Sequence, residues 1–342
     1  MNEFVTLEEI RAAKERIAGV AVRTPLYRVE RARLRMGGFP EPEFDLYIKA
    51  ESEQPIGSFK LRGAYNMVAQ LSAEALRRGV ITYSSGNHAQ GVAYAARALG
   101  AKAVIVMPAN APEVKKAATK ALGAEIVEVG PASSERRMKA EELVAEFGYA
   151  MIPPYDAREI IAGQATCGLE IVEQLPGVEL VMSPVSGGGL LSGTATAVKL
   201  AAEAGLVDAA VKVWGVEPEL AADAKESFYS KTLVEWPAAK TTRTIGDGLR
   251  TQSMGVLNFA HVMKFVDGIV TVSEEEILAA MRVMLGATKL VPEPSGAVTL
   301  AAALFHAEEL PRARKVTVVL SGGNLESELR ERLEGELAAG RA

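Results

Sequence analysis

A lysine with unusual neighbours stands in ESEQPIGSFKLRGAYN (residues 51–66), a stretch otherwise rich in glycine, serine and apolar residues. Lys60 lies between Phe59 and Leu61. If its side chain packs against an apolar wall, the ammonium group loses hydration and its pKa falls. A lysine of that kind can act as a nucleophile that forms imines. The alternative is an ordinary surface lysine at the start of a helix, and on this stretch alone we favour it.

A second candidate for chemistry is the glycine-rich turn SGGGLLSG (residues 186–193), which follows the apolar stretch ELVMSPV. Consecutive glycines let backbone N–H groups converge on an anion, and the N-terminus of a following helix adds positive potential. The turn matches neither the dinucleotide pattern GxGxxG nor the P-loop pattern GxxxxGK[ST]. It indicates a different phosphate site, with a tight turn packed on a sheet as the alternative.

The turn SSGNH (residues 84–88) has the polar groups to bind a carboxylate. Ser84, Ser85 and Asn87 would act together with the free backbone N–H groups of a helix start. His88 is a candidate general base, but we favour a histidine that only hydrogen-bonds to nearby groups.

Two carboxylates, Glu217 and Asp223, follow a strand-like stretch in GVEPELAAD (residues 215–223). Oxygen ligands in a loop suit Mg²⁺ or Ca²⁺. An acidic loop exposed to water explains the same pattern, and on these residues alone we favour it.

A desolvated lysine and an anion cradle are what an aldehyde cofactor with a phosphate group requires. A carboxylate site is what an amino-acid substrate requires. Pyridoxal phosphate (PLP) is therefore the simplest ligand that accounts for the lysine and the glycines together.

The elements that must position these residues alternate between strand type and helix type. We expect strands at 44–50, 79–84, 102–108 and 124–130, and later at ELVMSPVS, VKVWGVEP, DGIVTVS and KVTVVLSGG. Helices are expected between most of them, and Thr6 with Glu9 predicts a capping box at the start of the first helix, which extends to about Ile17. The pattern predicts a parallel sheet with helices on both faces, in which ligands bind beyond the carboxyl ends of the strands.

Composition limits the remaining possibilities. The 342 residues carry a formal net charge of −5, which argues against nucleic acid as a partner. No apolar run approaches the 18 residues of a membrane span, and the first residues lack a signal-peptide pattern. The single cysteine, Cys167, excludes an intrachain disulfide and fits a cytoplasmic protein.

Four blocks of the sequence resemble the serine/threonine dehydratase family of fold-type-II PLP enzymes, which includes threonine ammonia-lyases, serine racemases and hydroxyaspartate dehydratases. They are KAESEQPIGSFKLRGA, SSGNHAQGVAYAA, SGGGLLSG and SGGN, in the order typical of the family. The resemblance implies an α/β fold like that of the tryptophan synthase β-chain, with two open, twisted, mostly parallel sheets flanked by helices. It also implies a large PLP-binding domain (1–78 plus 157–342), a small inserted domain (79–156), and no C-terminal regulatory domain.

The same resemblance implies a role for each matching residue. Lys60 would hold the cofactor and act as the base on the substrate Cα–H, with Phe59 beside the ring. Asn87 would hydrogen-bond the phenolic oxygen, and Ser321 the pyridine nitrogen, which a hydroxyl leaves largely unprotonated. The phosphate would be bound by the backbone N–H groups of Gly187, Gly188, Gly189 and Leu190. The substrate carboxylate would be bound by Ser84, Ser85, Asn87 and His88.

Some residues resemble the racemase-like members more closely. Ser85 stands where many threonine ammonia-lyases carry alanine, and in the racemase-like members this serine is a second catalytic base. Glu217, the Ala221 carbonyl and Asp223 match the racemase-like metal site, so the resemblance favours bound Mg²⁺, or Ca²⁺ or Mn²⁺, over the exposed loop. Against a racemase, Tyr155 occupies a position where animal racemases carry asparagine.

The function we expect is a PLP-dependent ammonia-lyase that converts L-threonine or L-serine to 2-oxobutyrate or pyruvate plus ammonia. The alternatives are a serine racemase with dehydratase side activity and an L-threo-3-hydroxyaspartate dehydratase. The latter needs an extra cation, for which Arg136 and Arg158 are candidates. A non-catalytic binding protein is a further alternative, against which the complete set of Lys60, Asn87 and Ser321 argues. The family suggests a homodimer or homotetramer that acts on a small amino acid.

Overall fold

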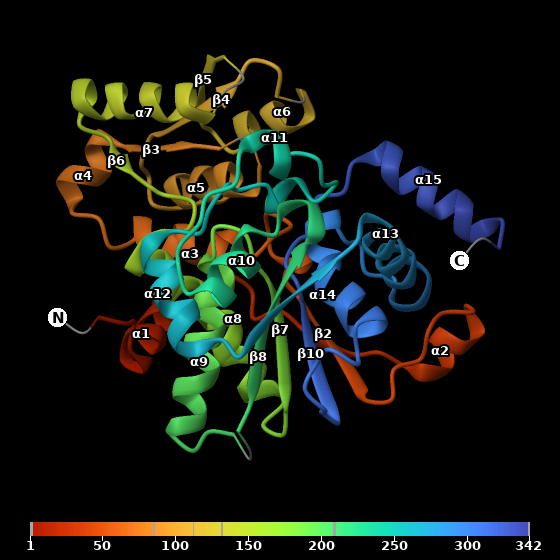
Figure 1. The fold of residues 1–342 in the computed structure, drawn as a ribbon. Helices are drawn as coiled ribbons and strands as arrows, with labels where there is room; N and C mark the ends of the chain where they lie inside the picture. Colours follow the sequence, from red (N-terminus) through yellow and green to blue (C-terminus); the bar gives the residue numbers. More distant parts are fainter. Residues whose placement is uncertain (1–2, 85, 112, 131–132, 208–209, 341–342) are drawn as a thin grey trace.

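The computed structural model describes residues 3–84, 86–111, 113–130, 133–207 and 210–340, and its strands form two separate sheets (Figure 1). The larger sheet has the strand order β1-β2-β10-β7-β8-β9. Its strands are β1 (Leu26–Arg28), β2 (Asp45–Ala50), β7 (Leu180–Pro184), β8 (Lys212–Pro218), β9 (Gly268–Val272) and β10 (Lys315–Leu320). All neighbours pair in parallel except β1, which runs antiparallel to β2.

The smaller sheet is fully parallel and has the order β5-β4-β3-β6. Its strands are β3 (Val80–Tyr83), β4 (Ala103–Pro108), β5 (Glu125–Val129) and β6 (Ala150–Met151). The mostly parallel α/β fold predicted from the sequence is therefore confirmed. The four strands lie inside the segment predicted as a small domain, while the domain boundaries at 79 and 156 stay a prediction.

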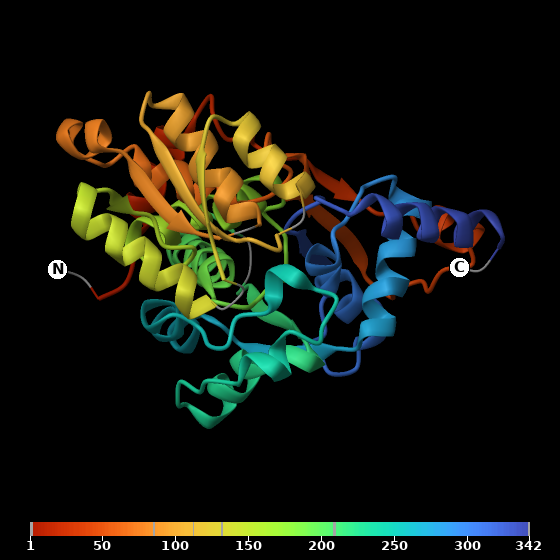
Figure 2. The same cartoon turned by 90° about the horizontal axis from the view of Figure 1, so that it is seen from above.

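Helices cover both faces of each sheet. In chain order they are α1 (Leu7–Ile17), α2 (Arg31–Met36), α3 (Lys60–Val68), α4 (Ala73–Arg78), α5 (Asn87–Ala98), α6 (Glu113–Ala121), α7 (Ser133–Phe147), α8 (Arg158–Gln174), α9 (Gly189–Glu203), α10 (Asp223–Ser230), α11 (Ala238–Thr241), α12 (Val256–Phe265), α13 (Glu274–Val283), α14 (Pro294–Phe305) and α15 (Ser327–Ala338). Figure 2 shows α7 on one face of the smaller sheet, with α5 on the other.

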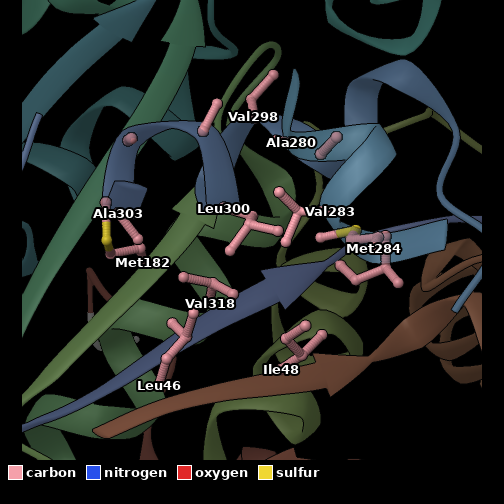
Figure 3. Packing of buried hydrophobic residues seen from close by; sticks show 14 of the residues in the cluster. Leu46, Ile48, Met182, Ala280, Val283, Met284, Val298, Leu300, Ala303 and Val318 are labelled. Atoms are coloured by element: carbon pink, nitrogen blue, oxygen red, sulfur yellow. The ribbon is translucent and has the colours of Figure 1, made fainter. Parts of the chain in front are cut away.

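The core of the larger sheet is divided by the alternation of side chains along its strands. On β10, Val318 packs with α13 and α14, whereas the next residue, Val319, packs with α8 and α9. Figure 3 shows the first of these clusters, in which Leu300 and Met284 lie against Val318 and its neighbours on β2 and β7. Since both faces are covered, the central strands are mostly apolar, which explains why the sequence shows them as largely apolar runs.

Helices α8 and α9 pack against each other near the centre of the molecule, and most of their residues are buried (Figure 1). A helix that is apolar on nearly every side needs neighbours all round, and α1, α3 and α12 provide them. This packing fixes the start of α9, which carries the glycine-rich turn, relative to the start of α3, which carries Lys60.

The predicted start of the first helix is confirmed in detail. The Thr6 hydroxyl accepts the Glu9 N–H at 3.3 Å, and the Glu9 carboxylate accepts the Thr6 N–H at 2.7 Å. Among the described residues, no helix combines the length and the apolar character that crossing a bilayer would require.

Candidate active site

Lys60 is brought to the edge of the larger sheet by the segment that precedes α3. Ser58 forms an isolated antiparallel bridge with Gly322, and the Phe59 N–H donates to the Ser321 carbonyl at 3.0 Å. The residues just before Lys60 therefore run beside the residues just after β10. Two predicted site residues from opposite ends of the sequence, Lys60 and Ser321, meet in this way.

The ammonium group of Lys60 lies inside the protein rather than on an exposed helix face. Its Nζ donates to the carbonyl of Pro154 at 2.7 Å and lies 5.2 Å from the centre of the Phe59 ring. Burial of the charge lowers the pKa of Lys60 to about 8, against an opposing effect of the Glu293 carboxylate. The interpretation as an ordinary surface lysine is therefore wrong, and the desolvated lysine is confirmed.

The side-chain amide of Asn87 is oriented by Glu293, which lies outside the four sequence blocks, and by Asn324, the last residue of SGGN. Its Nδ2 donates to both carboxylate oxygens of Glu293, at 2.9 and 3.1 Å. Its Oδ1 accepts from Nδ2 of Asn324 at 2.7 Å, and the same nitrogen of Asn324 donates to the Ile56 carbonyl. The two oxygens of Glu293 can accept the same hydrogen of the Asn87 amide. The second hydrogen of that NH₂ group is then left for a ligand.

Glu293 is a buried carboxylate beside this network. Burial raises the pKa of Glu293 to about 7, an effect that the hydrogen bond from Asn87 only partly offsets. The residue lies directly before Pro294 at the start of α14, and its backbone N–H donates to the Gly322 carbonyl. Its sequence context, VPEPSG, gave no signal of a site.

The glycine-rich turn forms the N-terminus of α9. The first helical hydrogen bond runs from the Ser192 N–H to the Gly188 carbonyl at 2.8 Å. The N–H groups of Gly189, Leu190 and Leu191 therefore have no acceptor within the helix. Gly188 is the N-cap, has φ of +96° and provides no side chain as a cap. A helix start of this kind, without a capping side chain among the described residues, suits an anion such as phosphate.

The ring of Tyr155 lies against this turn. A Cβ atom at Gly187 would fall only 2.3–2.5 Å from Tyr155 ring atoms, so a larger residue is excluded there. Glycine is therefore required for the close approach of this ring as well as for access to the backbone N–H groups.

The SSGNH turn is only partly described. The Ser84 hydroxyl accepts the Gly86 N–H at 3.3 Å, while the predicted second base, Ser85, lies outside the described residues. His88 is buried, and its Nε2 donates to the Ile152 carbonyl at 3.0 Å. Burial lowers the pKa of His88 to about 3, so this imidazole is neutral and unsuited to general-base work near pH 7. The favoured interpretation of His88 is confirmed, and its contact with substrate stays a prediction.

Glu217 and Asp223 are buried side by side, so the exposed acidic loop favoured from the residues alone is wrong. Glu217, on β8, accepts the backbone N–H groups of Ala224 and Lys225 at 3.2 and 3.0 Å. Both oxygens of Asp223 are buried, with no hydrogen-bond partner among the described residues. Burial and repulsion from Asp223 raise the pKa of Glu217 well above its usual range, and burial raises that of Asp223 to about 7.

This carboxylate pair fits a cation on the chemistry of its donors. Unpartnered buried carboxylate oxygens are what a hard divalent cation would neutralise. The buried Ala221, in the short turn Glu219–Ala221, lies between the two carboxylates in sequence, as the predicted ligand set requires. Within the described part of the chain, no group of three or more His, Cys, Asp or Glu side chains forms a candidate metal site.

Of the two arginines considered for a second substrate carboxylate, Arg158 is already engaged. Its guanidinium donates to both oxygens of Glu9, at 2.7 and 2.9 Å, and to the Phe4 carbonyl. It ties α8 to the N-terminal segment instead of facing the substrate residues. Arg136, on α7, is half-buried, and burial lowers its pKa.

A cluster of buried charges anchors the helix that carries Lys60. Arg62 donates to Glu51 at 2.7 Å and to Glu170 at 2.7 Å, and Lys49 donates to Glu170 at 2.6 Å. All four side chains are almost fully excluded from water. The cluster joins α3 to β2 and α8, because each of these elements supplies at least one of the charges.

Comparison with known proteins agrees with this architecture. Residues 17–322 match the family described as "Pyridoxal-phosphate dependent enzyme". The chain belongs to this family. It is 39% identical, over 94% of both chains, to the L-threo-3-hydroxyaspartate ammonia-lyase of Saccharomyces cerevisiae. It is 36% identical to the serine racemase of Schizosaccharomyces pombe, over 94% of this chain and 95% of that one.

Among solved structures, the threonine deaminase of T.th. superposes with a TM-score of 0.84. It is 43% identical, and the alignment covers 94% of this chain and 99% of that one. The expected fold-type-II family and its PLP dependence are confirmed, and the protein is a PLP-dependent lyase of the dehydratase type. The roles of the individual residues and the substrate within this family stay predictions.

The residues present fit PLP on two structural grounds. The uncapped start of α9 provides backbone donors for a phosphate, and Lys60 provides an amine whose pKa is low enough to react with an aldehyde. In addition, the hydroxyl of Ser58, two residues before Lys60, is buried with no hydrogen-bond partner among the described residues. Such an atom is consistent with a polar group that a bound cofactor would supply.

Proposed function

We propose that this protein is an ammonia-lyase acting on L-threonine and L-serine, which releases 2-oxobutyrate or pyruvate with ammonia. The observation that carries the proposal is the amine of Lys60, which burial brings to a pKa of about 8 and which donates to the Pro154 carbonyl beside the Phe59 ring. The threonine deaminase that superposes on 94% of the chain supports threonine as a substrate.

PLP, when bound, withdraws electrons from the substrate and so lowers the barrier to losing the Cα proton. In the proposed arrangement Lys60 holds the cofactor and then takes up that proton at Nζ. The free N–H of Asn87 donates to the phenolic oxygen, and Ser321 pairs with the pyridine nitrogen. A serine hydroxyl leaves that nitrogen largely unprotonated, which favours loss of a β-hydroxyl over long-lived charge at Cα.

The remaining residues are proposed to bind the substrate and the phosphate. Ser84, Ser85 and the N-terminus of α5 hold the substrate carboxylate, and the backbone of residues 187–190 holds the phosphate. We also propose that Glu217, Asp223 and the Ala221 carbonyl bind Mg²⁺, or Ca²⁺ or Mn²⁺ in its place, because their buried negative charge needs a counter-ion. A homodimer or homotetramer stays a prediction.

Elimination from L-threo-3-hydroxyaspartate is the second candidate function. It is favoured by the half-buried Arg136 and by the 39% identical yeast relative. Arg136→Ala, compared with Arg137→Ala as the matched control, tests it. Arg137 is the exposed neighbour that pairs with Glu141. If Arg136 binds the second carboxylate, only Arg136→Ala raises the KM for hydroxyaspartate, by about tenfold or more, while the KM for threonine changes little.

A substrate panel tests the main proposal. It contains L-threonine, L-serine, D-serine and L-threo-3-hydroxyaspartate, each with Mg²⁺ and with a chelator, and it measures 2-oxo acid release and chirality. Fast 2-oxobutyrate release from L-threonine supports the proposal. D-serine formation from L-serine, with slow threonine turnover and a marked loss under chelation, would instead support a racemase.

A further inference from the structure

The segment that crosses from β6 to α8 contacts two parts of the candidate active site. The Pro154 carbonyl accepts from Lys60, and the Tyr155 ring lies against Gly187. The carboxylate of the next residue, Asp156, reaches the N-terminus of α12. Asp156 is not part of any motif noted in the sequence, and the proposed reaction gives it no role.

Asp156 acts as the cap of α12 although it lies about one hundred positions away in sequence. Its carboxylate accepts the backbone N–H groups of Val256 at 3.1 Å, Leu257 at 2.9 Å and Asn258 at 3.3 Å. The N-cap of this helix is Gly255, which has no side chain that could accept these N–H groups. A Cβ atom at Gly255 would fall 2.3 Å from Oδ1 of Asp156, so glycine is what lets the carboxylate reach the helix.

Helix α12 in turn holds the glycine-rich turn in place. The Gly255 N–H donates to the Gly187 carbonyl at 3.0 Å, and the Ser192 hydroxyl donates to the Asn258 carbonyl at 3.1 Å. A Cβ at Gly188 would fall 2.8 Å from Cβ of Asn258, which shows how closely α12 backs the turn. Asn258 also donates to Asp156 from its own side chain. The start of α12 therefore contacts both Asp156 and the glycine-rich turn.

We infer that Asp156 is a positioning residue for the phosphate cradle: by capping α12 it fixes the helix against which Gly187 and Gly188 are held. This inference rests on the proposed use of residues 187–190 to bind the phosphate of PLP. It predicts a specific defect. Loss of Asp156 should loosen residues 187–190 and weaken binding of the phosphate group. The hydrogen bond from Lys60 to the Pro154 carbonyl should remain.

The test is a binding titration of the full-length protein after removal of the cofactor. Wild type and Asp156→Ala are titrated with PLP and with pyridoxal, which has the same aldehyde but no phosphate, and binding is followed by absorbance. We expect Asp156→Ala to bind PLP about five- to tenfold more weakly, in line with the usual effect of losing a helix cap. Pyridoxal binding should change by less than about twofold.

Two further variants control for general loss of stability. Ser273→Ala removes the cap of α13, a helix of the same ten-residue length as α12 that packs on α14, remote from the glycine-rich turn. It should lower the melting temperature without changing the dissociation constant for PLP. Asp156→Asn keeps an oxygen acceptor at the helix start, and asparagine is an equally good cap, so it should retain most of the affinity.

Either of two results would overturn the inference. Asp156→Ala could bind PLP as tightly as Ser273→Ala does, which would mean that the cap does not support the cradle. Alternatively, it could lose affinity for PLP and pyridoxal equally, which would place its effect on Lys60. Neither readout depends on which amino acid is the substrate, so failure of the proposed lyase activity is distinguishable from failure of this inference.

Discussion

The amide of Asn87 and the carboxylate of Glu293 are joined at 2.9 Å (Nδ2 to Oε1), although 206 positions separate them in sequence. Asn87 begins α5 beside the smaller sheet, and Glu293 precedes α14 on the larger sheet. The bond therefore connects the two halves of the active site. It also means that Asn87, the residue proposed to contact the phenolic oxygen, is hydrogen-bonded to a buried acid with a pKa of about 7.

Ionisation of Glu293 should control how firmly Asn87 is held. As pH rises through about 7 the carboxyl becomes a carboxylate, which is the stronger acceptor for the Asn87 N–H. We therefore expect kcat/KM to increase between pH 6 and 8 in the wild type. Glu293→Gln should flatten that part of the pH profile and lower kcat/KM by about tenfold, the effect of a lost charged hydrogen bond. A Gln variant that keeps the wild-type step near pH 7 would contradict this role.

The lowered pKa of Lys60 makes a prediction about cofactor capture. Only the neutral amine attacks an aldehyde, so the rate at which cofactor-free protein binds PLP should rise with pH and level off above about 8. If the pKa of Lys60 were that of an ordinary lysine, the rate of PLP binding would still increase as the pH approached 10. Stopped-flow absorbance over this range measures it. A midpoint near the usual lysine pKa would show that Lys60 is not desolvated in solution.

The carboxylate pair predicts a stabilisation by Mg²⁺ that depends on pH. The pKa of Asp223 is raised in the fold to about 7 from 3.8, so metal-free stability is greatest below the lower value and falls as pH rises through about 7. At pH 8 a cation offsets this loss, and Mg²⁺ at 100 times its dissociation constant contributes about 2.7 kcal/mol.

A thermal-unfolding series measures this effect. Mg²⁺ should raise the melting temperature by a few degrees at pH 8 and by much less at pH 5.5, relative to a chelator. Asp223→Asn should remove the response and, without metal, should be more stable than wild type at pH 8. Equal shifts at the two pH values, or none at pH 8, would argue against a cation at Glu217 and Asp223.

The buried charge cluster predicts a large effect of one arginine on stability. Arg62→Ala leaves Glu51 and part of Glu170 without their partner in a region closed to water. Losing one member of a buried ion pair costs about 3–5 kcal/mol, measurable by urea unfolding. Arg314→Ala, which breaks an exposed pair with Glu179, is the matched control and should have little effect. Similar losses in both variants would mean that the cluster has no special importance for α3.

The features of the fold and of the site that depend on local patterns were predictable from the sequence. The capping box at Thr6, the alternating strands and helices, and the glycine-rich turn after β7 each arise from neighbouring residues, and each is present. Lys60 beside Phe59 was also a local pattern, but that pattern alone favoured a surface lysine, and the burial of the amine depends on the fold around it.

What the sequence could not show depends on contacts between distant segments. Glu293 and Asp156 lie in stretches with no motif, and each matters only because another element, α5 or α12, reaches it. The paired burial of Glu217 and Asp223 was likewise invisible, because an acidic loop has the same sequence whether water covers it or not. The antiparallel strand β1 and helices α10–α12 were missed because their sequences are short or lack a clear period.

The most direct test of the central claim is the absorbance spectrum and L-threonine turnover of Lys60→Ala, purified in the presence of PLP. We expect the variant to lack the visible absorbance band of lysine-bound PLP and to release 2-oxobutyrate at less than about one-thousandth of the wild-type rate, while its melting temperature changes little. A variant that keeps the band, or that still converts threonine at a rate near wild type, would show that Lys60 is not the residue on which the chemistry depends.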